Sequence, residues 1–353
     1  MATEAAHLTT GRNRVVDMMK GLAIFLVVVG HSLPYGGWAR NYIYMFHVPL
    51  FFFVSGYCFK EKYLGDWKTF VRHRVKGLWW PFVKYGVPMV LLHNLFCQLH
   101  LYGPLCEVAP YSLQDTAKAV ARQFVMSGAE PLLGTYWFLN TLFGASLLFY
   151  VFRRMMGRAW TVALLTVGTV ASLLLMPHVE TLRIVFRMFL AGVYLALGHL
   201  FSSVPMQHIA NRHAILPLAV LVGIGVLFLP HEMTDATLPT LLPSIVVAVA
   251  GILMCWGLCR WVLALGGRIV SRLSAALDYV GRRTLTVMTW HLLCFKAVTL
   301  LIIGLYCLPI ERLEVIPVLE EQTSQGWWPA YVLAGMSVML VQPLVKTVTK
   351  KRG

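Results

Sequence analysis

Long apolar runs joined by short polar connections make up most of this sequence. A helix that crosses a bilayer needs about 20 mainly apolar residues, and ten runs reach that length. They lie near residues 15–33, 39–58, 78–97, 134–152, 159–177, 184–202, 214–230, 239–259, 284–307 and 328–346. Only two connections are long, 98–133 and 308–327. The pattern predicts an all-α, polytopic membrane helix bundle with about ten transmembrane helices.

Composition agrees with a membrane protein. The 353 residues are 58% hydrophobic and 13% charged, whereas a soluble domain carries about a quarter charged residues. No linker or change in composition separates a second domain, so we expect one domain over residues 1–353. The N-terminus has no short apolar segment followed by a small-residue cleavage site, and we expect no removed signal peptide.

The formal charge of +15 has a topological explanation. No basic low-complexity arm or recognition motif points to a nucleic-acid partner. Instead, basic clusters such as Arg72, Arg74 and Lys76 fall on the same side of the predicted bundle as the termini, and acidic residues such as Glu232 and Glu311 fall on the other. Under the positive-inside rule, the pattern predicts cytoplasmic N- and C-termini and a multi-pass protein of the cytoplasmic (inner) membrane.

The seven cysteines do not indicate a metal site. None forms a CxxC pair, and no histidine or carboxylate clusters with them at ligand spacing. Cys97 and Cys106 border a segment that we expect outside the membrane, where the two thiols would be able to form a disulfide. We therefore predict no bound metal.

One predicted membrane helix, "KGLAIFLVVVGHS", carries an ionisable group near each end. Eleven residues separate Lys20 from His31, and at about 100° each they end only about 20° past three full turns. The two side chains therefore share a helix face, about 16 Å apart along the axis. Ionisable groups at membrane depth cost free energy unless paired or hydrated, so this arrangement indicates function. We expect something long and narrow to lie between them.

Four further segments place polar residues in or next to the membrane: "MFHVPLFFFVSGY" with His47, "VRHRVKGLWWP" with its basic cluster, "GTYWFLNTLF" with Trp137 and Asn140, and "GRRTLTVMTWH" with His291. Each also has a structural interpretation. A buried histidine often bonds to a neighbouring helix, Trp137 suits an interfacial aromatic belt, and the basic cluster would serve topology alone. His47 lies at about the predicted depth of His31, and two such histidines favour acid–base chemistry or proton movement.

These segments together resemble the membrane acyltransferase 3 family. "DMMKGLAIFLVVVGHS" followed by "FHVPLFFFVSGY" matches the family's pattern of a basic residue, ten residues and a histidine, here Lys20 and His31. "YWFLNTLF" and "VGRRTLTVMTWH" are similar to later family segments. The likeness is greatest to the branch of fucose 4-O-acetylase-like and other sugar O-acetyltransferases. The family's Arg-x-x-Arg spacing after the second helix is not reproduced, so Arg72, Arg74 and Lys76 all compete for that role.

The resemblance implies O-acetylation of a polysaccharide or other glycan across the membrane. Acetyl-CoA or another acyl-CoA is then the cytoplasmic co-substrate, with no permanently bound cofactor, and the acceptor is a glycan or glycolipid hydroxyl at the outer face. His31 is the expected catalytic residue, as general base or acyl acceptor. Lys20, Arg72, Arg74 and Lys76 are candidates for the CoA phosphates. The candidates for orienting His31 or meeting the acceptor are His47, Trp137, Asn140 and His291.

Two other classes of function fit parts of the pattern. A proton-coupled glycan or lipid transporter or flippase would also use paired histidines, and inverted repeats or broken helices would favour it. A non-catalytic membrane scaffold or sensor would not need the spacing between Lys20 and His31. The long segments 98–133 and 308–327 contain no recognisable sugar-binding motif, so the sequence does not identify the acceptor.

Overall fold

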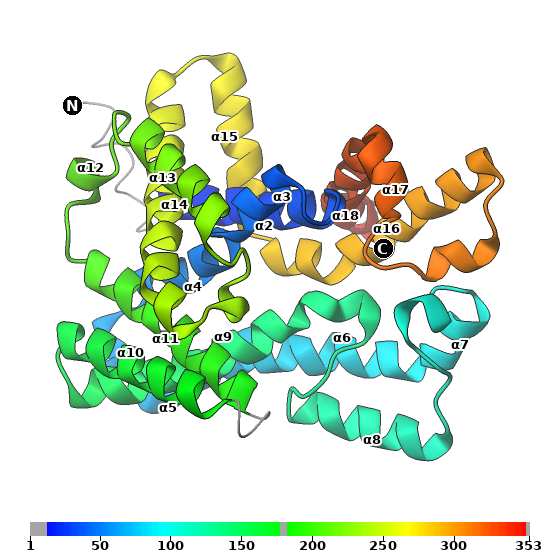
Figure 1. Ribbon diagram of the computed structural model, residues 1–353, viewed down its shortest axis with the longest axis horizontal. Coiled ribbons are helices and arrows are strands. Elements are labelled where there is room, and N and C mark those ends of the chain that lie inside the picture. The colour runs from blue at the N-terminus through cyan, green and yellow to red at the C-terminus, as the bar shows by residue number, and fades with distance from the viewer. Residues whose placement is uncertain (1–12, 177–181, 351–353) are drawn as a thin grey trace.

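The computed structural model describes residues 13–176 and 182–350, and all regular structure within them is helical (Figure 1). The α-helices are α2 (Arg14–Ser32), α3 (Trp38–Tyr44), α4 (His47–Tyr57), α5 (Trp67–Arg74), α6 (Trp80–Leu91), α7 (His93–Gln98), α8 (Leu113–Phe124), α9 (Trp137–Met155), α10 (Arg158–Leu175), α11 (Leu182–Phe201), α12 (Met206–Ile209), α13 (Ile215–Phe228), α14 (Leu238–Leu265), α15 (Arg268–Gly281), α16 (Thr284–Tyr306), α17 (Glu320–Gln322) and α18 (Trp328–Lys350). Short 3-10 or π turns are η2 (Glu61–Leu64), η3 (Val75–Trp79), η4 (Pro104–Cys106), η5 (Pro131–Tyr136), η6 (Met233–Asp235), η7 (Ile310–Glu314) and η8 (Thr323–Trp327).

Six helices in the described residues are long and apolar enough to cross a membrane. They are α2, η5 continued by α9, α10, α11, α14 and α16. Of the four remaining predicted spans, 328–346 lies within the single 23-residue helix α18, and the other three differ from single long helices. Residues 39–58 form α3 and α4, residues 78–97 form parts of η3, α6 and α7, and α13 has only 14 residues. The fold is therefore an all-helical membrane bundle in which several apolar segments are broken.

The break between α3 and α4 has a local cause. Phe46 adopts φ −142° and ψ −16°, outside the helical region, and α4 starts anew at His47. Pro49 follows within the first turn of α4, where its missing N–H leaves no helical hydrogen bond unmade. The consequence is that His47 stands at the first position of a new helix.

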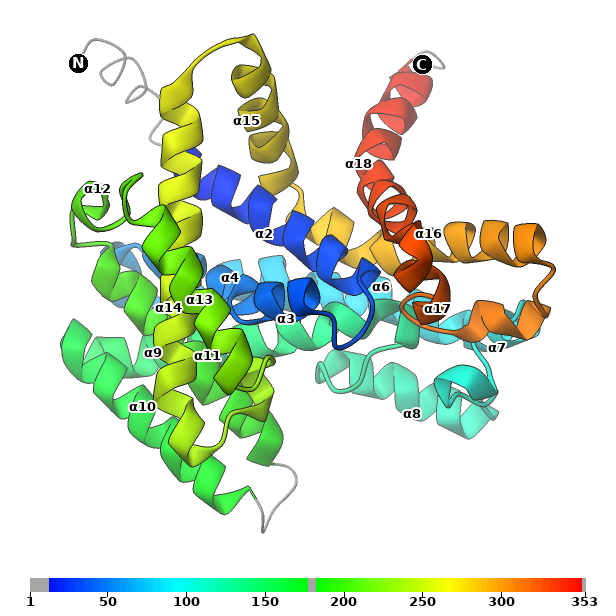
Figure 2. The same ribbon diagram turned by 45° about the horizontal axis from the view of Figure 1, so that its top comes forward.

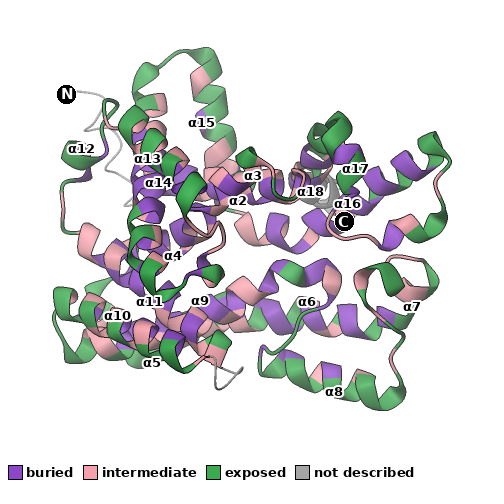
Figure 3. Cartoon of the chain, viewed as in Figure 1, coloured by how far each residue is buried: buried purple, intermediate pink, exposed green. Residues whose placement is uncertain are grey.

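The helix α2 occupies the centre of the bundle (Figures 1 and 2). It packs against α4, α14, α15, α16 and α18, elements drawn from most of the chain. Figure 3 shows buried residues concentrated in α2, α4 and α16, whereas α8 and α15 present many exposed residues. The polar side chains of α2 are thus surrounded by the rest of the protein.

Paired glycines bring α4 and α11 into backbone contact. A Cβ atom on Gly56 would lie 1.8 Å from the carbonyl oxygen of Leu195, and one on Gly198 would lie 1.9 Å from that of Phe53. Only glycine permits such an approach. The contact fixes the position of α4, which carries His47 at its other end.

A second pair of glycines joins α2 to α15. A Cβ atom on Gly21 would lie 2.0 Å from the carbonyl oxygen of Leu277, and one on Gly281 would lie 1.9 Å from that of Asp17. The crossing places the end of α15 beside the first turns of α2. It thereby brings Arg282, just after α15, to the same end of α2 as Lys20.

The two long connections contain helices and are joined to each other. The first is also fastened to α7, because the His93 Nδ1 at the start of that helix lies 2.7 Å from the Glu130 Oε2. Between the two, the His100 Nδ1 lies 3.1 Å from the Glu314 Oε1. The disulfide considered for Cys97 and Cys106 is not formed, because both thiols are free.

Candidate active site

A cavity of about 920 Å³ follows α2 along most of its length. On α2 it is lined by Asp17, Lys20, Ile24, Val27 and His31, a spacing of three or four residues that marks one helix face. Lys20 and His31 therefore both lie on the face of α2 that borders this cavity. We call this space the α2 cavity.

One end of the α2 cavity is basic. Lys20, His73, Arg74 and Arg282 line it, and we call this end the basic mouth. The Lys20 ammonium lies 3.8 Å from an Asp17 oxygen, and Arg282 is paired with Asp278. Arg74 donates to the hydroxyl of Ser55 over 3.3 Å. The basic mouth therefore brings several cations together. Lys20 and Arg282 are paired with carboxylates, whereas Arg74 is bonded to the neutral hydroxyl of Ser55.

The structure distinguishes among the three basic residues that were candidates for binding the CoA phosphates. Arg74 lines the α2 cavity, whereas Arg72 and Lys76 are exposed and are not part of its lining. The π-helical turn η3 begins directly after Arg74 and changes the direction in which successive side chains point. His73 and Arg282 were not predicted as site residues from the sequence, although both belong to the polar segments named above.

His31 lies in the last turn of α2, between two aromatic neighbours. Its Nδ1 is 3.4 Å from the hydroxyl oxygen of Tyr44, and its ring centroid is 5.6 Å from that of His291. Gly30 makes room for Tyr44, because a Cβ there would lie 2.9 Å from the tyrosine ring. Tyr44 and the direct neighbourhood of His291 were not predicted from sequence.

His47 and His291 each use one nitrogen to bond to backbone. The Nδ1 of His47 lies 2.9 Å from the carbonyl oxygen of Ile43, and the Nδ1 of His291 lies 2.9 Å from that of Val287. A carbonyl oxygen only accepts, so each Nδ1 carries the proton and each neutral ring has an unprotonated Nε2. The His291 Nε2 is buried without a hydrogen-bond partner in the described part of the chain. This nitrogen is therefore an unused hydrogen-bond acceptor next to His31.

The opposite end of the α2 cavity carries both signs of charge and aromatic rings. Tyr35, Arg40, Glu232 and Glu320 line it, and we call it the acidic mouth. The Arg40 guanidinium lies 3.9 Å from the centroid of Tyr44 and 4.3 Å from that of Tyr35, and it pairs with Glu232 at 3.6 Å. Arg40 and Tyr44 are four residues apart on α3, the spacing from which their contact was predictable.

The other predicted site residues lie at different places. Trp137 lines the α2 cavity, and its ring centroid lies 5.8 Å from the Arg187 guanidinium. Asn140, one turn further along α9, uses its amide to bond to the carbonyl oxygen of Met126 and is not part of the cavity lining. The cavity thus brings together Lys20, Arg74, His31, His47 and Trp137, with His291 packed directly behind His31.

A central helix with a charged cavity, enclosed by apolar helices, defines an integral membrane protein with an internal site. Comparison with known proteins identifies its family: residues 13–344 match the acyltransferase 3 family, described as an acyltransferase domain. The chain belongs to this family, and its domain is an acyltransferase domain.

One curated relative is the nodulation protein NolL of Mesorhizobium japonicum, which is 30% identical over 146 residues. The match covers 38% of this chain and 34% of NolL, so the chain spans about a third of that relative. No solved structure matches the chain.

Proposed function

We propose that this protein is a membrane O-acyltransferase. It moves an acetyl or other short acyl group from cytoplasmic acyl-CoA to a hydroxyl of a cell-surface or exported glycan. The observation that carries this proposal is the α2 cavity, which connects the cations of the basic mouth with His31. Membership of the acyltransferase 3 family supports the reaction class.

The proposed reaction requires the basic mouth to face the cytoplasm. We propose ten membrane crossings in the inner membrane, with both termini inside. The six long helices supply six of them; α3 with α4, α6 with α7, α13 and α18 supply the others. The positive-inside rule supports this orientation, because basic residues gather on the side of Lys20 and Arg74.

The donor would enter at the basic mouth. CoA has an anionic head and a thin pantetheine arm, and the head would be neutralised by Lys20, Arg74, His73 and Arg282. Arg72 and Lys76, on the surface nearby, would add to the attraction without direct contact. The arm reaches about 15–20 Å when extended, which matches the separation of about 16 Å between Lys20 and His31 along α2. The thioester would therefore arrive beside His31.

His31 would then act as general base. Its Nδ1 would donate to the Tyr44 oxygen, which leaves Nε2 free to take the proton of the sugar hydroxyl. The hydroxyl oxygen attacks the thioester carbonyl, the C–O bond forms, and the C–S bond breaks. The CoA thiolate leaves and receives the proton from His31. In a two-step variant His31 itself carries the acyl group before the sugar receives it.

The neighbours of His31 have supporting roles in this proposal. His47 and His291 would orient His31 or share its proton, and Trp137 would offer a ring face to the acceptor sugar. Because the Asn140 amide is already bonded to Met126, we propose that Asn140 shapes the start of α9. The acceptor would approach through the acidic mouth.

The test uses inside-out membrane vesicles that enclose a glycan acceptor and are supplied from outside with acyl-labelled acetyl-CoA. We expect label on glycan with wild-type protein and none with His31→Ala, at equal amounts of inserted protein. His213→Ala, which changes an exposed histidine, is the matched control and should retain activity. Near wild-type transfer by His31→Ala would refute the mechanism. Movement of glycan across the membrane without covalent label would support a transporter instead.

A further inference from the structure

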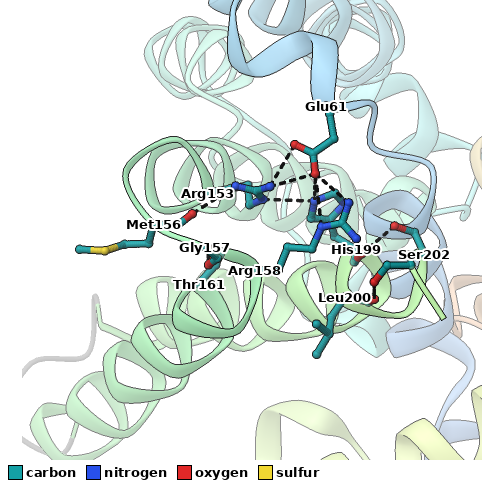
Figure 4. Close-up of polar contacts among 10 residues, drawn as sticks. Glu61, Arg153, Met156, Gly157, Arg158, Thr161, His199, Leu200 and Ser202 are labelled. Carbon is teal, nitrogen blue, oxygen red and sulfur yellow. Dashed lines mark hydrogen bonds and ion pairs between the residues drawn. The ribbon is translucent and has the colours of Figure 1, made fainter.

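A polar cluster beside the basic mouth has no role in the chemistry described above. Glu61, in η2, contacts polar side chains from three helices (Figure 4). The Arg153 Nη2 lies 2.9 and 3.0 Å from its two oxygens, the Arg158 Nη2 lies 2.8 Å from Oε1, and the His199 Nε2 lies 3.1 Å from Oε1. These residues belong to the end of α9, the start of α10 and α11. One carboxylate therefore joins three helix segments to η2.

The backbone of η2 is also bonded to α9. The Tyr150 hydroxyl donates to the carbonyl oxygen of Tyr63 over 3.1 Å, and Arg154 donates to that of Leu64. Glu61 supplies the side-chain part of this attachment. Together these bonds hold η2 against α9.

The same segment forms part of the wall of the α2 cavity. Phe59 and Tyr63, on either side of Glu61, line the cavity, and α5 follows with Arg74 at its end. The His199 ring packs edge-on against Phe59, with centroids 5.2 Å apart. A displacement of η2 would therefore be transmitted to Tyr63 and Arg74 at the basic mouth.

At neutral pH the charges of the cluster favour the attachment of η2 to Arg153 and Arg158. Burial would raise the pKa of Glu61, but the hydrogen bonds from Arg158 and Arg153 outweigh it, and the pKa lies below its usual value. Arg158 is the first residue of α10, where a cation is unfavourable beside the helix dipole, and the carboxylate offsets that charge. Since the Glu61 side chain is 45% exposed, these pairs contribute little to global stability. Their main effect is on where η2 lies.

We propose that Glu61 is a positioning residue that holds η2 and α5 in place and thereby shapes the donor end of the α2 cavity. The proposal rests on the proposed function, because it takes the basic mouth to bind the CoA head. Glu61 is not part of the lining of the α2 cavity. It acts through Tyr63 and Arg74.

Two measurements on Glu61→Gln in the full chain test this. Donor KM should rise about fivefold, in keeping with the coupling energies of contacting charged groups, while kcat and acceptor KM stay unchanged. Trypsin applied to inside-out vesicles should cleave faster after Lys60 and Lys62, two exposed residues next to Glu61. Glu61→Asp, which keeps the carboxylate, should recover part of both effects. Arg158→Gln, which removes one of the cations that pair with Glu61, should also raise donor KM and accelerate the cleavage.

The matched control is Glu311→Gln, which changes an exposed carboxylate in η7, at the opposite end of α16 from Arg282. It should alter neither measurement. Unchanged donor KM in both Glu61→Gln and Arg158→Gln would overturn the inference, whether or not proteolysis accelerates. A wild-type protein that transfers no acyl group would instead refute the proposed function, and the donor role of η2 with it. The proteolysis result still decides whether Glu61 anchors η2.

Discussion

The imidazole rings of His31 and His291 lie 5.6 Å apart, centroid to centroid, although one belongs to α2 and the other to α16. His291 is fully buried and its Nδ1 is held by the backbone of its own helix. The ring thus adds an unprotonated nitrogen to the environment of His31 without adding a charge. A buried nitrogen without a partner is unfavourable for stability, which points to a role in function.

His291→Phe should lower kcat by about 10²-fold, because acid–base groups contribute at least that much. Both KM values should change little, since the His291 ring is not part of the cavity lining. Thermal unfolding in detergent should occur at the same or a higher temperature, because a buried unpaired nitrogen is removed. A wild-type kcat would show that His291 only fills space.

Lys20→Ala and Arg74→Ala should each raise donor KM by about tenfold, the effect of losing one hydrogen bond to a charged group. Acceptor KM should not change, because both residues lie at the basic mouth. Arg72→Ala and Lys76→Ala are matched controls from the same basic cluster. As exposed charges outside the cavity they should change donor KM by less than about twofold. Equal effects of all four substitutions would contradict a defined head-group site.

CoA should protect Cys58 from alkylation. Cys58 lines the α2 cavity and is exposed, so a bound CoA head would block access to its thiol. The measurement is the rate of maleimide labelling of purified wild-type protein, followed by mass spectrometry, with and without CoA. Cys307, which is exposed at the far end of α16, is the internal control. Equal protection of both thiols, or of neither, would count against a donor site at the basic mouth.

Gly56→Ala should destabilise the protein, because the added methyl group would meet the Leu195 carbonyl oxygen at 1.8 Å. Neither backbone can yield without separating α4 from α11, so a loss of about 1–3 kcal/mol is expected, as for other overpacked contacts. The measurement is the unfolding temperature in detergent. Gly157→Ala is the control, since a Cβ at Gly157 meets no atom within 4 Å. An unchanged unfolding temperature for Gly56→Ala would show that the two helices do not require this close contact.

Much of the site on α2 was predictable from sequence. The register of Lys20 and His31 depends only on helix geometry, and apolar residues between them leave the ends as the only ionisable positions. The apolar runs likewise located most of the helices. These features are local, because backbone geometry and hydropathy determine them within one segment.

The breaks in the predicted spans were harder to foresee. A run of apolar residues has the same hydropathy whether it forms one helix or two, so 39–58 and 78–97 were predicted as single spans. The non-helical backbone at Phe46 divides the first of these. The glycine contacts between α4 and α11 involve residues far apart in sequence, and no pattern within one helix reveals them.

What the sequence by itself determined is the membrane class, the family resemblance and the shared face of Lys20 and His31, because each follows from one segment or from composition. Only the tertiary structure decided which cations line the cavity and that Tyr44 and His291 lie next to His31. It also decided that the Asn140 amide bonds to the Met126 carbonyl oxygen. It also brought Glu61 to Arg153, Arg158 and His199. These are contacts between helices, and they depend on how the whole bundle packs.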